Sequence, residues 1–344
     1  MRNPHRLHPL IVGLLSVVAI VLIVFTWHTD PAPFPDVAAP DATRVAPFHR
    51  EPISPLPVLA AEPPAKVALG ERLFHDPLLS SDRSVSCASC HDLALGATDR
   101  RARSLGVGDA PGAINSPTLF NSVFNFVQFW DGRAATLEDQ IAGPLHDPAE
   151  MATSWPQVIE RLQADRGYRR EFAAIYAEGI SEATIRDAIA SFERSLVTPD
   201  APFDRYLRGE ETAIPADAIE GYARFKAYGC TSCHQGVNVG GNLFQRFGVM
   251  GDYFAERGDL TRADLGRFNV TGREADRHVF KVPGLRNVAA TAPYFHDGSV
   301  EDLDEAVGMM GRYQLGRELS AEDRRLITAF LRTLSGNFRG TPVK

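Results

Sequence analysis

The chain has 344 residues, of which 44% are hydrophobic and 23% are charged, a composition typical of a soluble globular protein. This length allows two domains, each with its own hydrophobic core. The formal net charge of −7 argues against nucleic acid or an anionic membrane surface as the main partner, and it is compatible with the docking of a basic redox protein.

The N-terminus carries a targeting signal. Arg2, His5 and Arg6 precede an apolar run over residues 10–27, which would form a helix about 27 Å long, close to the hydrocarbon thickness of a bilayer. No small-residue cleavage site follows the run, so an uncleaved signal-anchor is favoured over a cleaved signal peptide. Because the positive residues come first, residues 1–9 are expected in the cytoplasm and the bulk of the chain across the membrane.

A proline- and alanine-rich segment, residues 28–63, follows the apolar run. Such a composition does not supply a core, and it predicts an extended, semi-rigid tether. Beyond it the pattern is helical, with almost no period-two alternation. Helices are expected over residues 64–75, 136–141, 155–164, 168–176, 181–197, 219–228 and 321–334. Residues 92–116 are expected to be irregular.

Two stretches share the pattern C-x-x-C-H, at residues 87–91 and 230–234. It is the attachment signature of a c-type haem, in which two thiols bond to the vinyl groups and the histidine binds the iron. The two motifs contain all the cysteines of the chain, which are Cys87, Cys90, Cys230 and Cys233. Zinc would need a second pair of ligands near each motif, and a disulfide framework would leave the histidines unexplained. The sequence therefore predicts two covalently bound haem c groups, with His91 and His234 as iron ligands.

An internal repeat relates the two halves of the chain. The motif Pro-x-Leu-x-Asn occurs at residues 117–121 and again at 283–287. Downstream, an Asp-Gly pair at residues 131–132 and 297–298 is followed, at the same spacing in both halves, by the start of a helix. Each half therefore has the organisation of one cytochrome c unit, and the chain is interpreted as a duplication.

The predicted fold is all-α. It consists of two cytochrome c-like domains with much loop, over residues 64–203 and 204–344, preceded by the N-terminal membrane anchor helix over residues 10–27.

The repeat also allows the residue expected at the second axial position of one iron to be compared with that of the other. Thirteen residues beyond the aspartate of the Asp-Gly pair, the second half has Met310 and the first half has Pro144. A methionine thioether is the usual second ligand of an electron-transfer haem, whereas proline cannot ligate iron. The C-terminal haem is therefore expected to be closed by His234 and Met310, and the N-terminal haem to keep an open site opposite His91.

Two polar residues near Pro144 are candidates for chemistry at an open haem. A carboxylate at Glu150 can take a proton from bound peroxide and return it to the leaving oxygen, and Gln140 can hydrogen-bond the bound oxygens. Solvent-facing positions for both side chains are the simpler alternative. Met309 is an alternative ligand for the C-terminal iron, and His146 is the one candidate that could close the N-terminal iron.

The motifs resemble those of the bacterial di-haem cytochrome c peroxidases, a family that includes the di-haem enzyme that matures the tryptophan-derived quinone of methylamine dehydrogenase. The resemblance covers about residues 64–338. Besides the two haem motifs, it rests on residues 129–140, 143–145, 148–151, 282–287, 293–298 and 310–316.

The resemblance implies that the N-terminal haem reacts with peroxide, with Gln140 and Glu150 as distal residues. It implies that the C-terminal haem, ligated by Met310, transfers electrons, and that Trp130 is an electron relay between the haems.

The resemblance also implies one calcium ion between the domains. Its ligands would be Asn115 and the backbone carbonyls of Thr291 and Pro293, and calcium favours amide and carbonyl oxygens of this kind.

One stretch differs from typical members of the family. They carry a histidine in the loop after the first haem motif, which closes the peroxidatic iron until the other haem is reduced, whereas residues 104–109 contain none. The quinone-maturation enzyme also lacks this histidine, but a tyrosine holds its second haem where this chain has Met310. The N-terminal haem is therefore expected to be high-spin and reactive with peroxide in the all-ferric state.

The favoured function is reduction of hydrogen peroxide on the periplasmic side of the bacterial inner membrane. The electrons are expected from a c-type cytochrome, a small copper protein or a quinol, by way of the C-terminal haem. Oxidation of side chains in a partner protein and non-catalytic electron transfer are the alternatives, and the second is disfavoured because carriers usually close both irons. A homodimer is compatible with these expectations.

Overall fold

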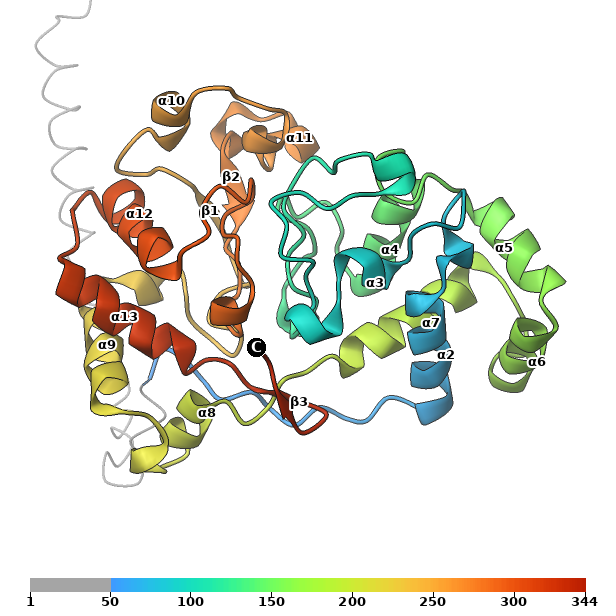
Figure 1. Cartoon of the computed structure of the whole chain (residues 1–344), viewed down its shortest axis with the longest axis horizontal. Helices are drawn as coiled ribbons and strands as arrows, with labels where there is room; N and C mark the ends of the chain where they lie inside the picture. The colour runs from blue at the N-terminus through green and yellow to red at the C-terminus, as the bar shows by residue number, and fades with distance from the viewer. Residues whose placement is uncertain (1–50) are drawn as a thin grey trace, which may run out of the picture. The chain divides into compact units, whose positions relative to one another are not determined.

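The computed structural model describes residues 51–344 of the chain (Figure 1). The expected membrane helix over residues 10–27 and the first part of the expected tether, residues 28–50, lie outside the described residues. Within the described part, no helix combines the length and the apolar character needed to cross a bilayer. The membrane anchor therefore stays a prediction.

Helices joined by long loops make up most of the regular structure, so the fold is mostly helical as expected. The helices of the described residues are α2 (Pro64–His75), α3 (Cys87–Cys90), α4 (Leu137–His146), α5 (Trp155–Ala164), α6 (Arg166–Ile175), α7 (Glu182–Ser195), α8 (Pro202–Leu207), α9 (Ala216–Ala227), α10 (Tyr253–Arg257), α11 (Phe268–Thr271), α12 (Leu303–Leu315) and α13 (Ala321–Arg332). Two small antiparallel sheets pair β1 (Phe244–Arg246) with β2 (Val279–Lys281) and β3 (Asn337–Phe338) with β4 (Thr341–Pro342). The 3₁₀ turns between these elements are one turn long.

The expected helix boundaries agree with the observed ones within a few residues, except at α4. This helix begins after Thr136, whose side chain accepts a hydrogen bond from the Asp139 amide, as an N-cap residue does. The expected end at Ile141 is too early, because α4 continues to His146 with Pro144 inside it. Pro144 has no N–H to donate to the Gln140 carbonyl, so α4 lacks one backbone hydrogen bond in its last turn, and the helix ends two residues later.

The core of the N-terminal half is formed by α2, α4, α5, α6 and α7. Leu73, Phe172 and Ile185 are among its fully buried residues. Helix α2 crosses α7 at Gly70, where an added Cβ atom would lie 1.9 Å from the carbonyl oxygen of Ala188. The two helix backbones are therefore in direct contact, and no residue larger than glycine fits at this position.

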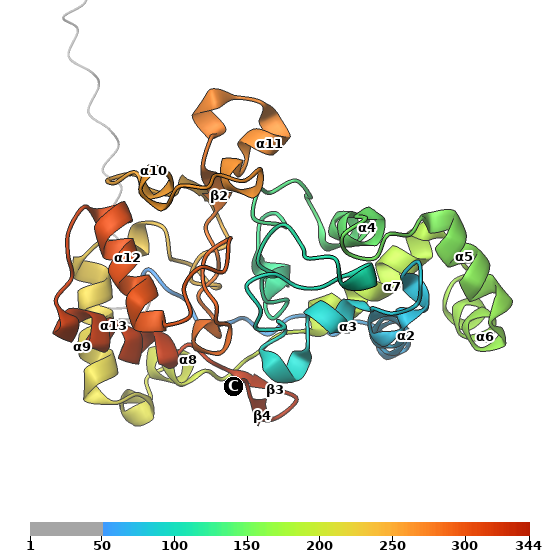
Figure 2. The same ribbon diagram turned by 45° about the horizontal axis from the view of Figure 1, so that its top comes forward.

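The core of the C-terminal half repeats this arrangement with α9 and α13, which lie side by side in Figures 1 and 2. A Cβ atom added at Gly221 of α9 would lie 1.9 Å from the carbonyl oxygen of Leu326 on α13. In each half, the helix before the haem motif thus crosses the last helix at a glycine. The division of the chain between residues 203 and 204 remains a prediction.

Part of the expected tether packs against the C-terminal half, which corrects the expectation for residues 51–56. Ile53 is 1% exposed and belongs to the C-terminal core. The backbone on both sides of it bonds to Gly236, whose amide donates to the Pro52 carbonyl at 2.9 Å and whose carbonyl accepts from the Ser54 amide. Proline-rich composition disfavours a core of its own, but it does not prevent a few apolar side chains from joining an existing one.

The asparagines of the two Pro-x-Leu-x-Asn motifs meet at a single residue, Thr198. The amide groups of Asn121 and Asn287 donate to the Thr198 hydroxyl at 2.8 and 3.0 Å, and the Thr198 amide donates to the Asn121 side chain at 3.0 Å. Both asparagines have a left-handed backbone, with φ of 63° and 61°, a conformation that asparagine tolerates better than most residues. The repeated motifs are therefore joined to each other through buried hydrogen bonds.

Candidate functional site

Both C-x-x-C-H motifs border one cavity of about 640 Å³. This volume lies within the usual range of ligand sites. The first motif presents its cysteines from α3 and the second from a 3₁₀ turn, Cys230–Ser232. All four thiols line the cavity, and none is in a disulfide.

The two motif histidines are held in the orientation that a metal ligand needs. The Nδ1 atom of His91 lies 3.2 Å from the Ala97 carbonyl oxygen, and that of His234 lies 3.3 Å from the Val239 carbonyl oxygen. A hydrogen bond of this kind leaves Nε2 free to bind a metal and fixes the ring. Burial lowers the pKa of both rings, that of His234 to about 4. Both rings are therefore neutral near pH 7, which is the form that ligates iron.

These residues fit two c-type haems. The unpaired thiols and the oriented rings face a common cavity, and apolar side chains such as Leu145 and Leu331 complete its walls. Burial raises the pKa of the Cys87 thiol to about 12 and that of Cys230 to about 11. The thiols are thus protonated and are unlike the exposed, low-pKa thiols of redox sites.

Pro144 and Met310, the residues at the predicted second axial positions, occupy equivalent places in the two halves. Pro144 on α4 and Met310 on α12 each lie seven residues after the leucine that begins the helix, and both border the cavity. Met309, the alternative to Met310, does not line the cavity. His146 does not line it either, and its ring packs edge-on against Trp155 with the ring centroids 6.0 Å apart.

Glu150 and Gln140 border the cavity together with Pro144. Burial raises the pKa of the Glu150 carboxyl to about 6, Asp147 adds to this effect, and Arg133 opposes it. The loop over residues 104–109, which contains no histidine, holds the backbone of Glu150, because the Val107 amide donates to the Glu150 carbonyl at 2.8 Å. A carboxyl with this pKa can both accept and release a proton near neutral pH.

Trp130 borders the same cavity and contacts both halves of the chain. Its indole Nε1–H donates to the Asn115 carbonyl at 3.0 Å, and its own carbonyl accepts from the Lys281 amide at 2.7 Å. In the repeat, Trp130 corresponds to His296, and the two rings lie edge-to-face with centroids 6.4 Å apart. The relay role of Trp130 stays a prediction, although its position between the halves suits it.

The three residues expected to bind calcium also border the cavity. The side-chain amide of Asn115 donates to the Arg101 carbonyl at 3.0 Å, which leaves its oxygen free, and its backbone amide donates to the His296 carbonyl at 2.8 Å. Thr291 and Pro293 lie in the loop that leads to His296. The calcium ion stays a prediction.

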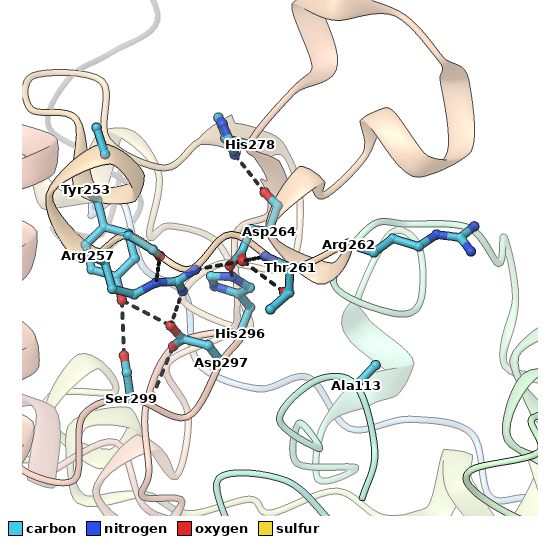
Figure 3. Close-up of polar contacts among 12 residues, drawn as sticks. Ala113, Tyr253, Arg257, Thr261, Arg262, Asp264, His278, His296, Asp297 and Ser299 are labelled. Carbon is cyan, nitrogen blue, oxygen red and sulfur yellow. Dashed lines mark hydrogen bonds and ion pairs between the residues drawn. The ribbon is translucent and has the colours of Figure 1, made fainter.

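A buried polar cluster that sequence reasoning missed surrounds Asp264 (Figure 3). One carboxylate oxygen of Asp264 accepts from His296 Nε2 at 2.7 Å, and the other accepts from Arg257 and from the Thr261 amide and hydroxyl. Burial alone would raise the pKa of Asp264, but these hydrogen bonds outweigh it and hold that pKa well below its usual range. Arg257 also bridges to Asp297, so both carboxylates are already paired with a guanidinium and no metal is assigned here. The cluster fixes the His296 ring beside Trp130.

Two buried ionisable residues of the cavity wall, Glu193 and Lys281, were also missed by sequence reasoning. Glu193 on α7 is 4% exposed, its Oε2 atom has no hydrogen-bond partner among the described residues, and burial raises its pKa to about 8. Its position four residues after Ile189, on the apolar stripe of α7, was the available signal. Lys281 lies two residues before the second Pro-x-Leu-x-Asn motif, and nothing in the sequence marked it as buried.

Comparisons with known proteins agree with this geometry. The family model of the di-haem cytochrome c peroxidases matches residues 64–212. The chain is 52% identical over 293 residues to cytochrome c peroxidase Ccp of Escherichia coli K12, an alignment that covers 85% of this chain but only 63% of that protein. It is 45% identical over 291 residues to the cytochrome c551 peroxidase of Nitrosomonas europaea, covering 83% of this chain and 85% of that protein. Among solved structures, it is similar to a MauG-like protein associated with microbial copper homeostasis, with a TM-score of 0.69, 30% identity, and coverage of 85% and 94%.

Proposed function

The chain belongs to the di-haem cytochrome c peroxidase family, and we propose that it reduces hydrogen peroxide to water at its N-terminal haem site with electrons received at its C-terminal haem site. Its mostly helical structure has the two-domain fold of di-haem peroxidases. The observation that carries the proposal is the contrast between Pro144 and Met310 at equivalent places on the cavity wall. One site can bind peroxide, and the other is closed for electron transfer.

Two haem c groups would be held by the four cysteines and by the two motif histidines. When bound, they would supply iron that binds peroxide in the N-terminal site and iron that transfers electrons in the C-terminal site. The protein contributes ligand orientation through His91 and His234, a distal acid–base group, and a fixed separation between the two sites.

Glu150 is proposed to move the proton that the reaction requires. Reduction of one peroxide molecule consumes two electrons and two protons and yields two water molecules. In its ionised form, Glu150 would accept a proton from one oxygen of the peroxide and return it to the other, so that water rather than hydroxide departs. Because its pKa is raised to about 6, both the protonated and the ionised form of the Glu150 carboxyl are populated near pH 6. The Gln140 amide is proposed to orient the peroxide by a hydrogen bond.

Electrons are proposed to pass from the C-terminal site by way of Trp130. Its hydrogen bonds to Asn115 and Lys281 fix the indole between the halves of the chain. The donor is proposed to be a periplasmic c-type cytochrome, a small copper protein or a quinol, and the net negative charge suits a basic protein donor.

The acid–base role of Glu150 is tested by Glu150→Gln in the haem-loaded enzyme. Stopped-flow mixing with peroxide gives the second-order rate constant, which is expected to fall by about 10²–10⁴-fold. Glu160→Gln, at an exposed glutamate of α5 in the same half, is the matched control and should leave the rate unchanged. An unchanged rate in the Glu150 variant would reassign this residue to a structural role.

Peroxidase function itself is tested by steady-state consumption of peroxide with a reduced c-type cytochrome. Sustained turnover is the expected result. A protein that reacts with peroxide but does not turn over with any small redox protein would favour oxidation of a partner protein instead. The absence of histidine from residues 104–109 is the feature that supports this second candidate.

A further inference from the structure

Lys281 is a buried cation that has no partner in the described part of the chain. It is the last residue of β2, it is 7% exposed, and it borders the cavity that both haem motifs share. Burial lowers the pKa of its ammonium group to about 8, and no neighbouring carboxylate or hydrogen bond acts against that effect. The other deeply buried cation, Arg286, is in contrast bonded through two nitrogens to the Asp204 carboxylate at 2.9 Å.

A buried ammonium group without a counter-charge is costly, and buried charges in proteins are almost always paired. Lys281 borders a cavity that the prosthetic groups are to fill. Its counter-charge can therefore come from whatever occupies that cavity. An anionic group of the occupant would restore the ordinary charged state of the lysine and offset the cost of burying it.

The backbone that follows Lys281 is bonded to the segment after the second haem motif. The next residue, Val282, is bonded through its carbonyl to the Gly241 amide and through its amide to the Leu243 carbonyl. Pro283, two residues after Lys281, lines the cavity together with Cys233 and His234 of the second haem motif. The strand that carries Lys281 therefore leads directly into the wall of the C-terminal haem site. Haem c has two propionate carboxylates, which take no part in its attachment to cysteine or in iron ligation.

We propose that the ammonium group of Lys281 binds a propionate carboxylate of the C-terminal haem and raises the reduction potential of that haem. This inference rests on the haem assignment made under the proposed function. A cation beside a haem stabilises its reduced form, because the ferrous group carries one positive charge fewer than the ferric group. Lys281 thus favours acceptance of an electron at the site that receives electrons from the donor.

The test is a spectroscopic redox titration of the haem-loaded full-length protein. In Lys281→Met, the midpoint potential of the C-terminal haem is expected to fall by about 59 mV or more, which is a tenfold change in a one-electron reduction equilibrium. Lys281→Gln, a second neutral variant that keeps hydrogen bonding, should shift it in the same direction, and Lys281→Arg should restore most of the wild-type potential. Lys226→Met is the matched control, because Lys226 lies four residues before Cys230 on the surface and already pairs with Glu51.

Three results would overturn the proposal. The first is an unchanged midpoint potential in both neutral variants, and the second is a shift in the potential of the N-terminal haem alone. The third is a wild-type potential that changes with chloride concentration at constant ionic strength, because that would identify a free anion as the partner of Lys281. Peroxide turnover of the wild-type protein, measured separately, distinguishes failure of this inference from failure of the proposed function. A potential shift without peroxide turnover would retain the lysine–propionate pair and remove the peroxidase function.

Discussion

Substitution of Gly221 by alanine probes the helix crossing that supports the second haem motif. The new methyl group would lie 1.9 Å from the Leu326 carbonyl oxygen, whereas ordinary van der Waals contact begins at 3.4 Å. The obstructing atoms belong to the backbone of α13 and cannot rotate away, so α9 and α13 must separate by about 1.5 Å at this point, the difference between those two distances. Overpacking of this kind costs about 1–3 kcal/mol, occasionally more. The better helix propensity of alanine returns about 0.5–1 kcal/mol.

The expected net effect is a loss of up to about 2.5 kcal/mol, which we would measure by urea unfolding of the haem-loaded protein followed by circular dichroism. Gly308→Ala on α12 is the matched control, because a Cβ atom there would meet only the flexible side chain of Arg324, at 3.1 Å. The control should be neutral or slightly stabilising. If the two variants unfold at the same urea concentration, then close backbone contact does not determine the stability of this crossing.

Two further predictions concern ionisation and iron coordination. The pKa of Glu193 is raised from an ordinary 4.5 to about 8 in the folded protein. Between these two pH values the folded state therefore binds one proton more than the unfolded state. The stability that this proton contributes is complete below about pH 4.5 and is lost as the pH rises through about 8. Glu193→Gln should therefore gain stability over the wild type by a few kcal/mol between pH 5 and pH 8, and a difference in urea midpoint that does not vary with pH would contradict the buried, protonated carboxyl. For the resting ferric protein, electron paramagnetic resonance should show one high-spin haem, opposite Pro144, and one low-spin haem ligated by Met310; a spectrum with low-spin iron alone would mean that another residue closes the N-terminal site.

Local sequence patterns predicted the elements that depend on local interactions. The bounds of α5 follow from its apolar spacing, and the C-x-x-C-H motifs and the repeat placed Pro144 and Met310 at equivalent positions. Each of these features depends on a few residues that are close together in the sequence, so it can be predicted from the sequence alone. Glu150 and Gln140 border the cavity as expected, whereas their roles in proton transfer and peroxide binding remain to be tested.

Features that depend on long-range contacts were missed. The Asp264 cluster joins residues 32 positions apart, and the backbone of Lys281 is held by the pairing of β2 with β1 and by a hydrogen bond to the Trp130 carbonyl. The core contribution of Ile53 was hidden in the same way, since its partners lie in the C-terminal half. A charged or proline-rich stretch is exposed by default, and only the tertiary structure reveals the exceptions.

The contact of Asn121 and Asn287 with Thr198 has a consequence for how the duplicated chain can change. The asparagine exists in two copies, but its hydroxyl partner exists once, in the segment that joins the halves. Loss of one asparagine leaves the other's bond to the hydroxyl intact. Loss of the threonine hydroxyl removes the bond of both asparagine amides in one step, and only the bond from the Thr198 amide to Asn121 remains. The two halves can therefore diverge freely around their separate haem motifs, as they have at Pro144 and Met310, but the residue they share can be altered only if both halves accommodate the same change.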